Sequence, residues 1–337
     1  MDWFEKLTGF RETGYVQTRA QLEVIGDRLR SRVNGASYGI GQFELVSLQA
    51  LRERAASAPA LPGRMSVSLV RGDVRQMHRQ PAHAGALFQV ASQFNMLEMV
   101  GPSVTPEDGV TRYRDDPTQG PACAIAAGAA TIWRNYFAPV DGGYGQTELR
   151  QLDGLAGLGA ALSDGAGLPP GALWTMRNGY ALATQEGLAA IRQHLDSLSA
   201  EKVDALRGAL SIGLHHDVEA TEAEAPEPHH VCQAFCSALP VGYSEVAAGH
   251  WHAFAALVLE AAYEATMWAG VLNARRGASN IVFLTLLGGG AFGNRPDWIH
   301  SAVRRALEMM KPYALDVRLV SYGEPSRDLV SLVRELG

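Results

Sequence analysis

The chain has 337 residues and a formal net charge of −6, with 47% hydrophobic and 19% charged residues, which is ordinary for a globular protein. We find no run of about 20 apolar residues and no basic start followed by an apolar core, so neither a membrane span nor a secretory signal is expected. No Lys/Arg-rich run stands out, so we expect no nucleic-acid partner, and an anionic ligand would need local backbone amides and helix ends.

Cysteine is sparse, with only Cys123, Cys232 and Cys236. An odd, small number does not build a disulfide framework and suits a reducing compartment, so a cytoplasmic location is expected. His229 and His230 lie near two of these cysteines, but the spacing does not complete a four-ligand zinc set. We therefore expect buried cysteines and no metal site.

The N-terminal part is expected to be helical. Residues 15–60 are interpreted as mostly helix, because Leu45, Leu48 and Leu51 fall on one helical face. Residues 1–63 are therefore expected to form a helical extension that precedes the main domain.

From residue 65 onward the pattern of apolar and polar residues changes. Alternating residues predict a strand over 65–70, and a short apolar run predicts another over 87–91. A polar loop is expected over 101–117, and a helix over 121–137 because Pro121 suits a first turn. Residues 140–170 are rich in glycine and are expected to be irregular.

The last part of the chain predicts strands and helices in alternation. Amphipathic helices are expected within 185–211, an exposed acidic loop over 217–228, a buried strand over 231–239 and a long helix over 252–275. Strand 281–287, helix 296–311 and strand 315–322 follow. This order is typical of an α/β sheet, so we expect one α/β domain over 64–330 with an insertion at about 140–228.

A glycine-rich turn joins strand 281–287 to the next helix. It comprises Gly288, Gly289, Gly290, Ala291, Phe292, Gly293 and Asn294. Successive amides in such a turn, followed by a helix start, can cradle a diphosphate. The alternative is a tight connection that binds nothing, and the spacing alone does not decide between them.

Polar residues follow two other predicted strands. Asp73 can accept a hydrogen bond from an amine, and Asn95 can both donate to and accept from a ribose diol. Gln119 and Gly120 stand at a helix start whose amides are free for a phosphate. Turn-capping side chains and tight helix packing are the simpler alternatives for each residue taken alone.

Three of these segments together resemble the macrodomain superfamily. They are Val67-Ser-Leu-Val-Arg-Gly-Asp-Val74, Leu87-Phe-Gln-Val-Ala-Ser-Gln-Phe-Asn95 and Leu287-Gly-Gly-Gly-Ala-Phe-Gly-Asn294, and the last is similar to the diphosphate loop of the poly(ADP-ribose) glycohydrolase branch. The paired Gln-Glu of that branch is absent. The resemblance implies a three-layer α/β/α fold with a central mixed sheet, ADP-ribose as ligand and no required cofactor.

The resemblance also implies a role for each matching residue. Asp73 and Val74 would contact adenine, and Asn95 would contact the distal ribose. Gln119 and Gly120 would face the diphosphate together with the 288–294 turn.

An acidic stretch after Asn95 could supply catalytic groups. Cleavage of a glycosidic bond to ribose uses carboxyl groups as acid, base or stabiliser, and a carboxylate can also bind a guanidinium leaving group. The candidates are Glu98, Glu107, Asp108, Asp115 and Asp116, with Glu98 and Asp116 preferred. A solvated acidic loop is the alternative.

The sequence therefore predicts a hydrolase that removes ADP-ribose from a modified protein, with ADP-ribosylarginine as the suggested linkage. Two alternatives remain open. One is a non-catalytic ADP-ribose binding module, and the other is a sensor of NAD-related nucleotides that couples binding to a partner.

Overall fold

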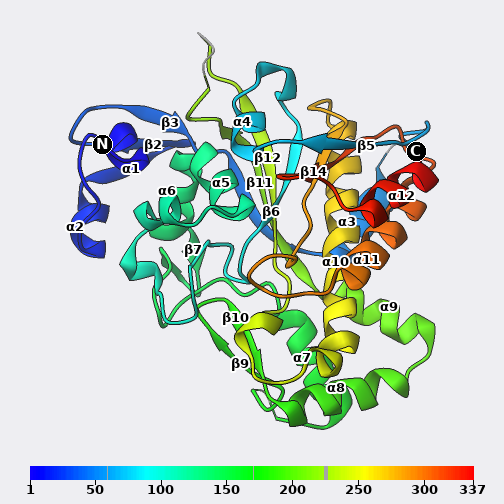
Figure 1. Ribbon diagram of the computed structural model, residues 1–337. Helices are drawn as coiled ribbons and strands as arrows, with labels where there is room; N and C mark the ends of the chain where they lie inside the picture. Colours follow the sequence, from blue (N-terminus) through cyan, green and yellow to red (C-terminus); the bar gives the residue numbers. More distant parts are fainter. Residues whose placement is uncertain (59, 170, 224–226) are drawn as a thin grey trace.

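A computed structural model describes residues 1–58, 60–169, 171–223 and 227–337. Its centre is a seven-stranded mixed sheet with the order β4-β11-β12-β6-β13-β14-β5 (Figure 1). The strands are β4 (Gln42–Ser47), β5 (Ser66–Arg71), β6 (Leu87–Ala91), β11 (Ser211–Glu219), β12 (His230–Cys236), β13 (Ile281–Leu284) and β14 (Asp316–Ser321). The expected α/β class with a central mixed sheet is confirmed.

Five neighbouring strands of this sheet run parallel. β12 pairs with β6, β6 with β13, β13 with β14, and β14 with β5, all in parallel register. β11 is antiparallel to both β12 and β4. The carboxyl ends of the parallel strands therefore meet at one edge of the sheet, where α/β proteins usually bind ligands.

Helices cover both faces of the sheet. On one face lie α3 (Leu48–Ser57), α10 (Ala248–Arg275), α11 (Pro296–Met310) and α12 (Arg327–Leu336); on the other lie α4 (Val74–His78), α5 (Gln119–Ala126) and α6 (Gly128–Tyr136) (Figure 1). The three layers match the expected α/β/α arrangement. The helix expected over 121–137 is in fact two helices, because the backbone at Ala127 leaves the helical region (φ −114°, ψ 58°).

Helix α10 is the central helix of its layer. By length and composition alone it could cross a membrane, but 78% of its most apolar window is buried inside the protein. It packs on α3, α8 (Gln185–Asp196) and α11 and on strands of the sheet. Its apolar character is thus explained by burial on all sides.

The expectation of helix over residues 15–60 is wrong for most of that range. Only α2 (Tyr15–Ala20) and α3 are helical, and between them lie β1 (Leu22–Ile25), β2 (Arg28–Ser31), β3 (Ser37–Gly39) and β4. Leu48 and Leu51 are buried on α3, whereas Leu45 lies exposed on strand β4. A helical spacing that spans the end of a strand and the start of a helix produced the error. The segment before residue 64, which opens with helix α1 (Trp3–Thr8), therefore also supplies an edge strand of the central sheet.

The expected insertion also needs a correction. Residues 140–170 include α7 (Ala156–Ala166), and β9 (Trp174–Arg177) and β10 (Tyr180–Ala183) form a separate hairpin. Helices α8 and α9 (Ala200–Gly208) confirm the amphipathic helices. The insertion does not continue to 228, because β11 belongs to the central sheet. The predicted acidic loop begins inside β11, and its residues 224–226 lie outside the described part of the chain.

Candidate functional site

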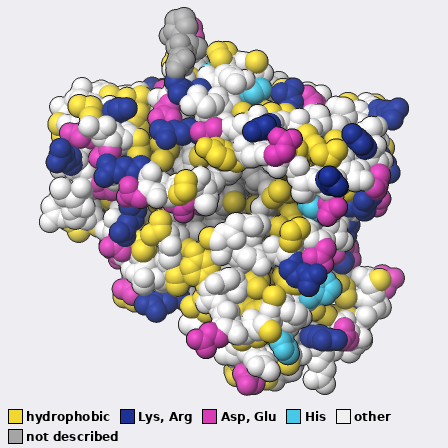
Figure 2. All heavy atoms as spheres, in the orientation of Figure 1, with side chains coloured by type: hydrophobic (Ala, Val, Ile, Leu, Met, Phe, Trp, Pro, Cys, Tyr) yellow, Lys and Arg dark blue, Asp and Glu magenta, His cyan; other side chains and the backbone are white. Residues whose placement is uncertain are grey.

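A cavity of about 350 Å³ opens at the carboxyl ends of the parallel strands. Its wall includes Ala91 at the end of β6, Ala238 after β12, Thr285 after β13, and Val320 and Ser321 on β14. The surface is hollowed near the middle of the face seen in Figure 2, with hydrophobic side chains around the hollow. The volume suits a small-molecule site, and the position is the one that the strand topology favours.

Glu98 is the most unusual group in the wall of this cavity. Its side chain is 3% exposed, and its Oε1 has no hydrogen-bond partner within the described residues. Burial raises the pKa of Glu98 well above its usual value; the positive charge of Arg134 opposes this effect and the nearby Asp116 adds to it. A carboxyl group whose pKa is raised keeps its proton to a higher pH and can act as a general acid.

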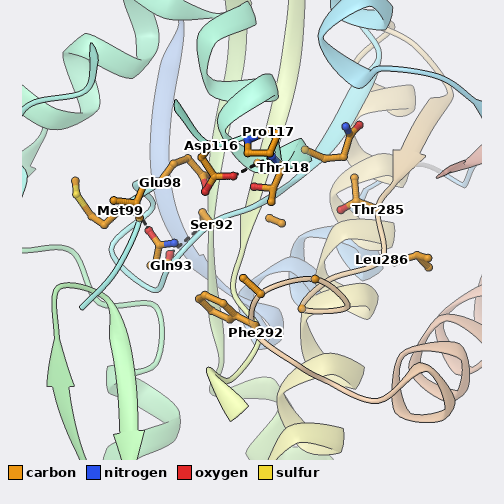
Figure 3. Close-up of a pocket in the computed structure, with 18 of the residues that line it drawn as sticks. Ser92, Gln93, Glu98, Met99, Asp116, Pro117, Thr118, Thr285, Leu286 and Phe292 are labelled. Carbon is orange, nitrogen blue, oxygen red and sulfur yellow. Dashed lines mark hydrogen bonds between the residues drawn. The ribbon is translucent and has the colours of Figure 1, made fainter. Parts of the chain in front are cut away.

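Asp116 is the second carboxylate of the cavity wall (Figure 3). Its Oδ1 accepts a hydrogen bond from the backbone N–H of Thr118 at 2.9 Å, which fixes it beside the start of α5. Glu98 and Asp116 are the charged residues that line the cavity among those described, and no Lys or Arg side chain joins them. A bound anion would therefore need backbone donors.

The other acidic candidates do not reach the cavity. Asp108 accepts from the backbone N–H of Thr105 at 2.9 Å and so caps a short 3-10 turn. Asp115 has a side chain 68% exposed and pairs with Arg114. Glu107 accepts from the backbone N–H of Glu148. None of these three carboxylates lines the cavity, which corrects the catalytic set expected from the sequence.

The turn from Gly288 to Asn294 forms the opposite wall of the cavity (Figure 3). The backbone N–H groups of Gly288, Gly290, Ala291 and Phe292 make no hydrogen bond within the described part of the chain. All four residues line the cavity. A row of free amides at a strand-to-helix turn can bind an anion such as a phosphate.

The remaining residues of this turn hold its shape. Asn294 is buried, donates from Nδ2 to the Leu239 carbonyl at 2.8 Å and closes the turn through its N–H to the Gly288 carbonyl at 2.9 Å. Gly289 faces Ile299 of α11, and Gly293 has a φ of 68°. These three residues, expected to bind the ligand, do not line the cavity; they support the loop.

The start of helix α5 faces this turn across the cavity. Gln119 and Gly120 line the wall, and the first N–H groups of a helix have no partner in the helix itself. A side chain at Gly120 would overlap the Ala91 carbonyl oxygen and lie 2.6 Å from Oε2 of Glu98. Only glycine allows the helix to start this close to Glu98. Thr118 precedes the helix, but its side chain makes no capping hydrogen bond.

Three residues expected to contact the ligand lie outside the wall. Asn95 is fully buried; it donates to Gln151 and accepts from the N–H of Leu97, so it shapes the turn before Glu98. Val74 is buried in the core, and its N–H donates to Oε1 of Gln119. Asp73 caps helix α4 by accepting from the N–H of Arg75 at 2.8 Å.

Asp73 nevertheless stands next to the site. The N–H of Gly72 donates to the carbonyl of Ser321, a residue of the cavity wall. The expected contact between Asp73 and adenine therefore stays a prediction.

An aromatic wall that the sequence does not reveal flanks Glu98. Tyr180, Tyr243 and Phe292 pack against one another with ring centroids 5.1 to 5.6 Å apart, and all three line the cavity. The hydroxyl of Tyr180 donates to the carbonyl of Met99 at 2.6 Å. The hairpin β9–β10 is thereby tied to the segment that carries Glu98.

Several other wall residues were missed. They are Ser92, Gln93, Met99, Val100, Pro117, Thr118, Thr285, Leu286, Val320, Ser321 and Tyr322. Ser92 and Gln93 could have been found from the rule that ligands bind beyond strand ends. Tyr180 and Tyr243 carried no such signal, because they come from the insertion and from the segment after β12.

The described residues contain no group of three or more His, Cys, Asp or Glu side chains placed to hold a metal. Cys123, Cys232 and Cys236 are buried free thiols. Nothing in this part of the chain is arranged as a metal centre.

The fold and cavity define an α/β protein with a cavity at the carboxyl edge of a mixed sheet, lined by two carboxyl groups and by amides that have no partner among the described residues. No family model matches the sequence, and no curated protein matches it.

Solved structures of poly(ADP-ribose) glycohydrolase have a similar fold. The enzyme from Deinococcus radiodurans in complex with ADP-ribose gives a TM-score of 0.45 at 12% identity, covering 97% of this chain and 98% of that one. The enzyme from Thermomonospora curvata gives 0.45 at 12% identity, with 96% of both chains covered. Its complex with the inhibitor ADP-HPD gives 0.43 at 11% identity, with 95% of this chain and 96% of that one covered. At these values the likeness concerns the arrangement of the backbone and assigns no role to a residue.

Proposed function

We propose that this protein binds ADP-ribose in the cavity and hydrolyses the bond that links its distal ribose to a substrate. The observation that carries the proposal is the pairing of a buried carboxyl group, Glu98, with a turn of four free amides across one cavity. The amides and the start of α5 supply donors for a diphosphate, and Glu98 supplies a proton. Neither requires a cationic side chain, and none lines the cavity among the described residues.

The chemical step needs one acid and one base. Glu98 gives its proton to the leaving atom as the bond to the ribose C1 breaks. Water adds to that carbon and passes a proton to Asp116, so the two carboxyl groups together conserve protons. Once Glu98 has given up its proton, its carboxylate places negative charge near the oxocarbenium-like state and so stabilises that positive centre.

Binding is tested first by calorimetric titration of ADP-ribose into the unmodified protein and into Gly290→Glu. A side chain at Gly290 meets nothing within 4 Å, so the variant should fold while its carboxylate repels the diphosphate. We expect micromolar binding by the unmodified protein and its loss in the variant. Equal affinity in both proteins, or no binding by the first, would remove the diphosphate site.

We further propose an arginine linkage as the preferred substrate. The cavity has two carboxyl groups and an aromatic wall at the Glu98 end, and a guanidinium group binds both to carboxylates and to aromatic faces. Asp116→Asn keeps the acceptor for Thr118 but removes the charge. We expect it to lower turnover of ADP-ribosylarginine at least tenfold more than turnover of a serine-linked substrate, measured by release of ADP-ribose. Equal losses on both linkages would count against arginine.

A further inference from the structure

Arg134 is a buried cation without a carboxylate partner. It lies on α6, its side chain is fully buried, and no ion pair joins it to an acidic side chain in the described part of the chain. Removing a guanidinium from water is costly unless its donors are satisfied and its charge is compensated. The structure therefore has to account for this charge.

Neutral acceptors satisfy its donors. Nε donates to the Met96 carbonyl at 3.1 Å, Nη2 donates to Oγ1 of Thr131 at 3.1 Å, and Nη1 lies 3.2 Å from Nδ1 of His215. The guanidinium also lies over the ring of Phe235, 3.8 Å from its centroid. Burial lowers the pKa of Arg134 to about 10, so the group stays charged at neutral pH, while burial keeps His215 neutral by lowering its pKa well below the usual value.

The bond to Met96 links Arg134 to the turn that carries Glu98. Met96 has a φ of 63°, a conformation that a non-glycine residue adopts only under tertiary constraint. The same turn is held by Gln146, which donates to both the Asn95 carbonyl and the Arg134 carbonyl at 3.1 Å. The backbone N–H of Glu98 then donates to the hydroxyl of Tyr113.

Arg134 is the cation beside Glu98. Its Nε is bonded to the carbonyl of Met96, two residues before Glu98, and among the described residues no Lys or Arg side chain lines the cavity. The other titratable groups near Glu98 are Asp116, the hydroxyls of Tyr113 and Tyr180 and the thiol of Cys123, and none of these is a cation. When Glu98 loses its proton, Arg134 is the group whose field stabilises the new carboxylate.

We propose that Arg134 is the positioning residue of the site: it holds the strained Met96 turn that presents Glu98, and it is the buried countercharge against which Glu98 ionises during the reaction. The inference rests on the proposed hydrolase function. It adds that Glu98 can release a proton inside a buried site only because Arg134 already carries an uncompensated charge there.

The direct test is the titration of the Glu98 carboxyl, followed by NMR of protein labelled at glutamate side chains and assigned by the signal lost in Glu98→Gln. We compare the unmodified protein with Arg134→Met and Arg134→Lys, and use Arg52→Lys on α3 as the control. Loss of an opposite charge raises the pKa of a buried carboxyl group, by roughly one unit or more where the charge is near. We expect an upward shift of about one unit in Arg134→Met, a smaller shift in Arg134→Lys and none in the control.

The kinetic readout separates this role from a purely structural one. In Arg134→Met we expect kcat to fall at least tenfold, with KM nearly unchanged and the high-pH limb of the kcat profile displaced upward; Arg134→Lys should restore part of both. A loss of kcat with the limb unmoved, or an unchanged Glu98 midpoint in Arg134→Met, would overturn the proposal. If Arg134→Met does not fold, the same titration of the neutral Arg134→Gln decides.

A failure of the proposed function would be seen differently, as no turnover by the unmodified protein. The NMR titration still tests the coupling of the two charges in that case.

Discussion

Glu98 is held out of water although a carboxyl group is more stable in it. The cost of desolvation shows as its raised pKa and its unpaired Oε1. Proteins keep a destabilising group of this kind where a function requires it. Asp116, by comparison, is partly exposed and accepts a hydrogen bond from a backbone N–H, so the two carboxyl groups lie in different environments.

Glu98→Gln should therefore separate stability from activity. The amide has the same shape but, unlike the carboxyl group, need not take up a proton when the chain folds at neutral pH, so we expect a higher melting temperature, unchanged ADP-ribose affinity and a loss of turnover of about 10²- to 10⁴-fold. Scanning calorimetry and a release assay measure the two effects, with Glu308→Gln, an exposed residue of α11, as the control. Full turnover in Glu98→Gln would exclude it as the acid.

At the scale of elements, the site depends on how closely α5 approaches β6. The carbonyl of Ala91 at the end of β6 and the carboxyl of Glu98 occupy the space where a side chain at Gly120 would lie. The helix start is also held from a second side, because Oε1 of Gln119 accepts from the N–H of Val74 at the start of α4.

Gly120→Ala is expected to lower the free energy of unfolding by about 1–3 kcal/mol through overpacking and to abolish ligand binding by moving the start of α5. Gly249→Ala is the matched control: it also lies in the first turn of a helix, and its added methyl meets nothing within 4 Å. Urea denaturation and titration with ADP-ribose would show both effects. Wild-type stability in Gly120→Ala would mean that the helix can shift freely.

Much of the sheet could be predicted because its strands have a clear pattern. Strands β5, β6, β13 and β14 are short runs of alternating or continuous apolar residues, and burial forces that pattern. Strands β1 to β4 carry Arg, Glu, Ser and Tyr on small or exposed elements, so no period survives in the sequence.

The site was predictable only where a local rule applies. Glycines before a helix indicated the amide turn, and two acidic residues after β6 indicated the carboxyl groups. The contact of Tyr180 with Met99 joins distant segments, so spacing along the chain does not encode it. The bond between Thr105 and Asp108 is a local capping box, and its spacing of three residues could have excluded Asp108 from the catalytic candidates.

At the scale of the whole molecule, buried histidines link stability to pH. Burial lowers the pKa of His78 to about 4, and it also lowers those of His83 and His215. In the unfolded chain these groups take up protons near pH 6.5. As the pH falls from about 6.5 toward 4 the unfolded state binds more protons than the folded state, so stability present above 6.5 is lost.

We expect the free energy of unfolding to fall steadily as the pH falls from about 6.5 to 4, and we expect His78→Asn to make this dependence on pH shallower. His216 has the opposite sign: the neighbouring Cys232 and Glu44 raise its pKa to about 9, so its contribution to stability is complete below about 6.5 and is lost as the pH rises through 9. Denaturant titrations at several pH values test both, with the exposed His250→Asn as the control. A slope unchanged by His78→Asn would show that other groups cause the acid sensitivity.

The edge strand β4 also has a consequence for how the chain is made. Ser47 of β4 pairs with Ser211 of β11, so the N-terminal strand has no partner until the ribosome has added much of the remaining chain. At roughly 5–20 residues per second, the wait is on the order of ten seconds. During this time β4 has unpaired backbone groups and can pair with strands of other chains. We therefore expect the early part of the chain to need shielding by a chaperone, and a version synthesised without β11 to aggregate.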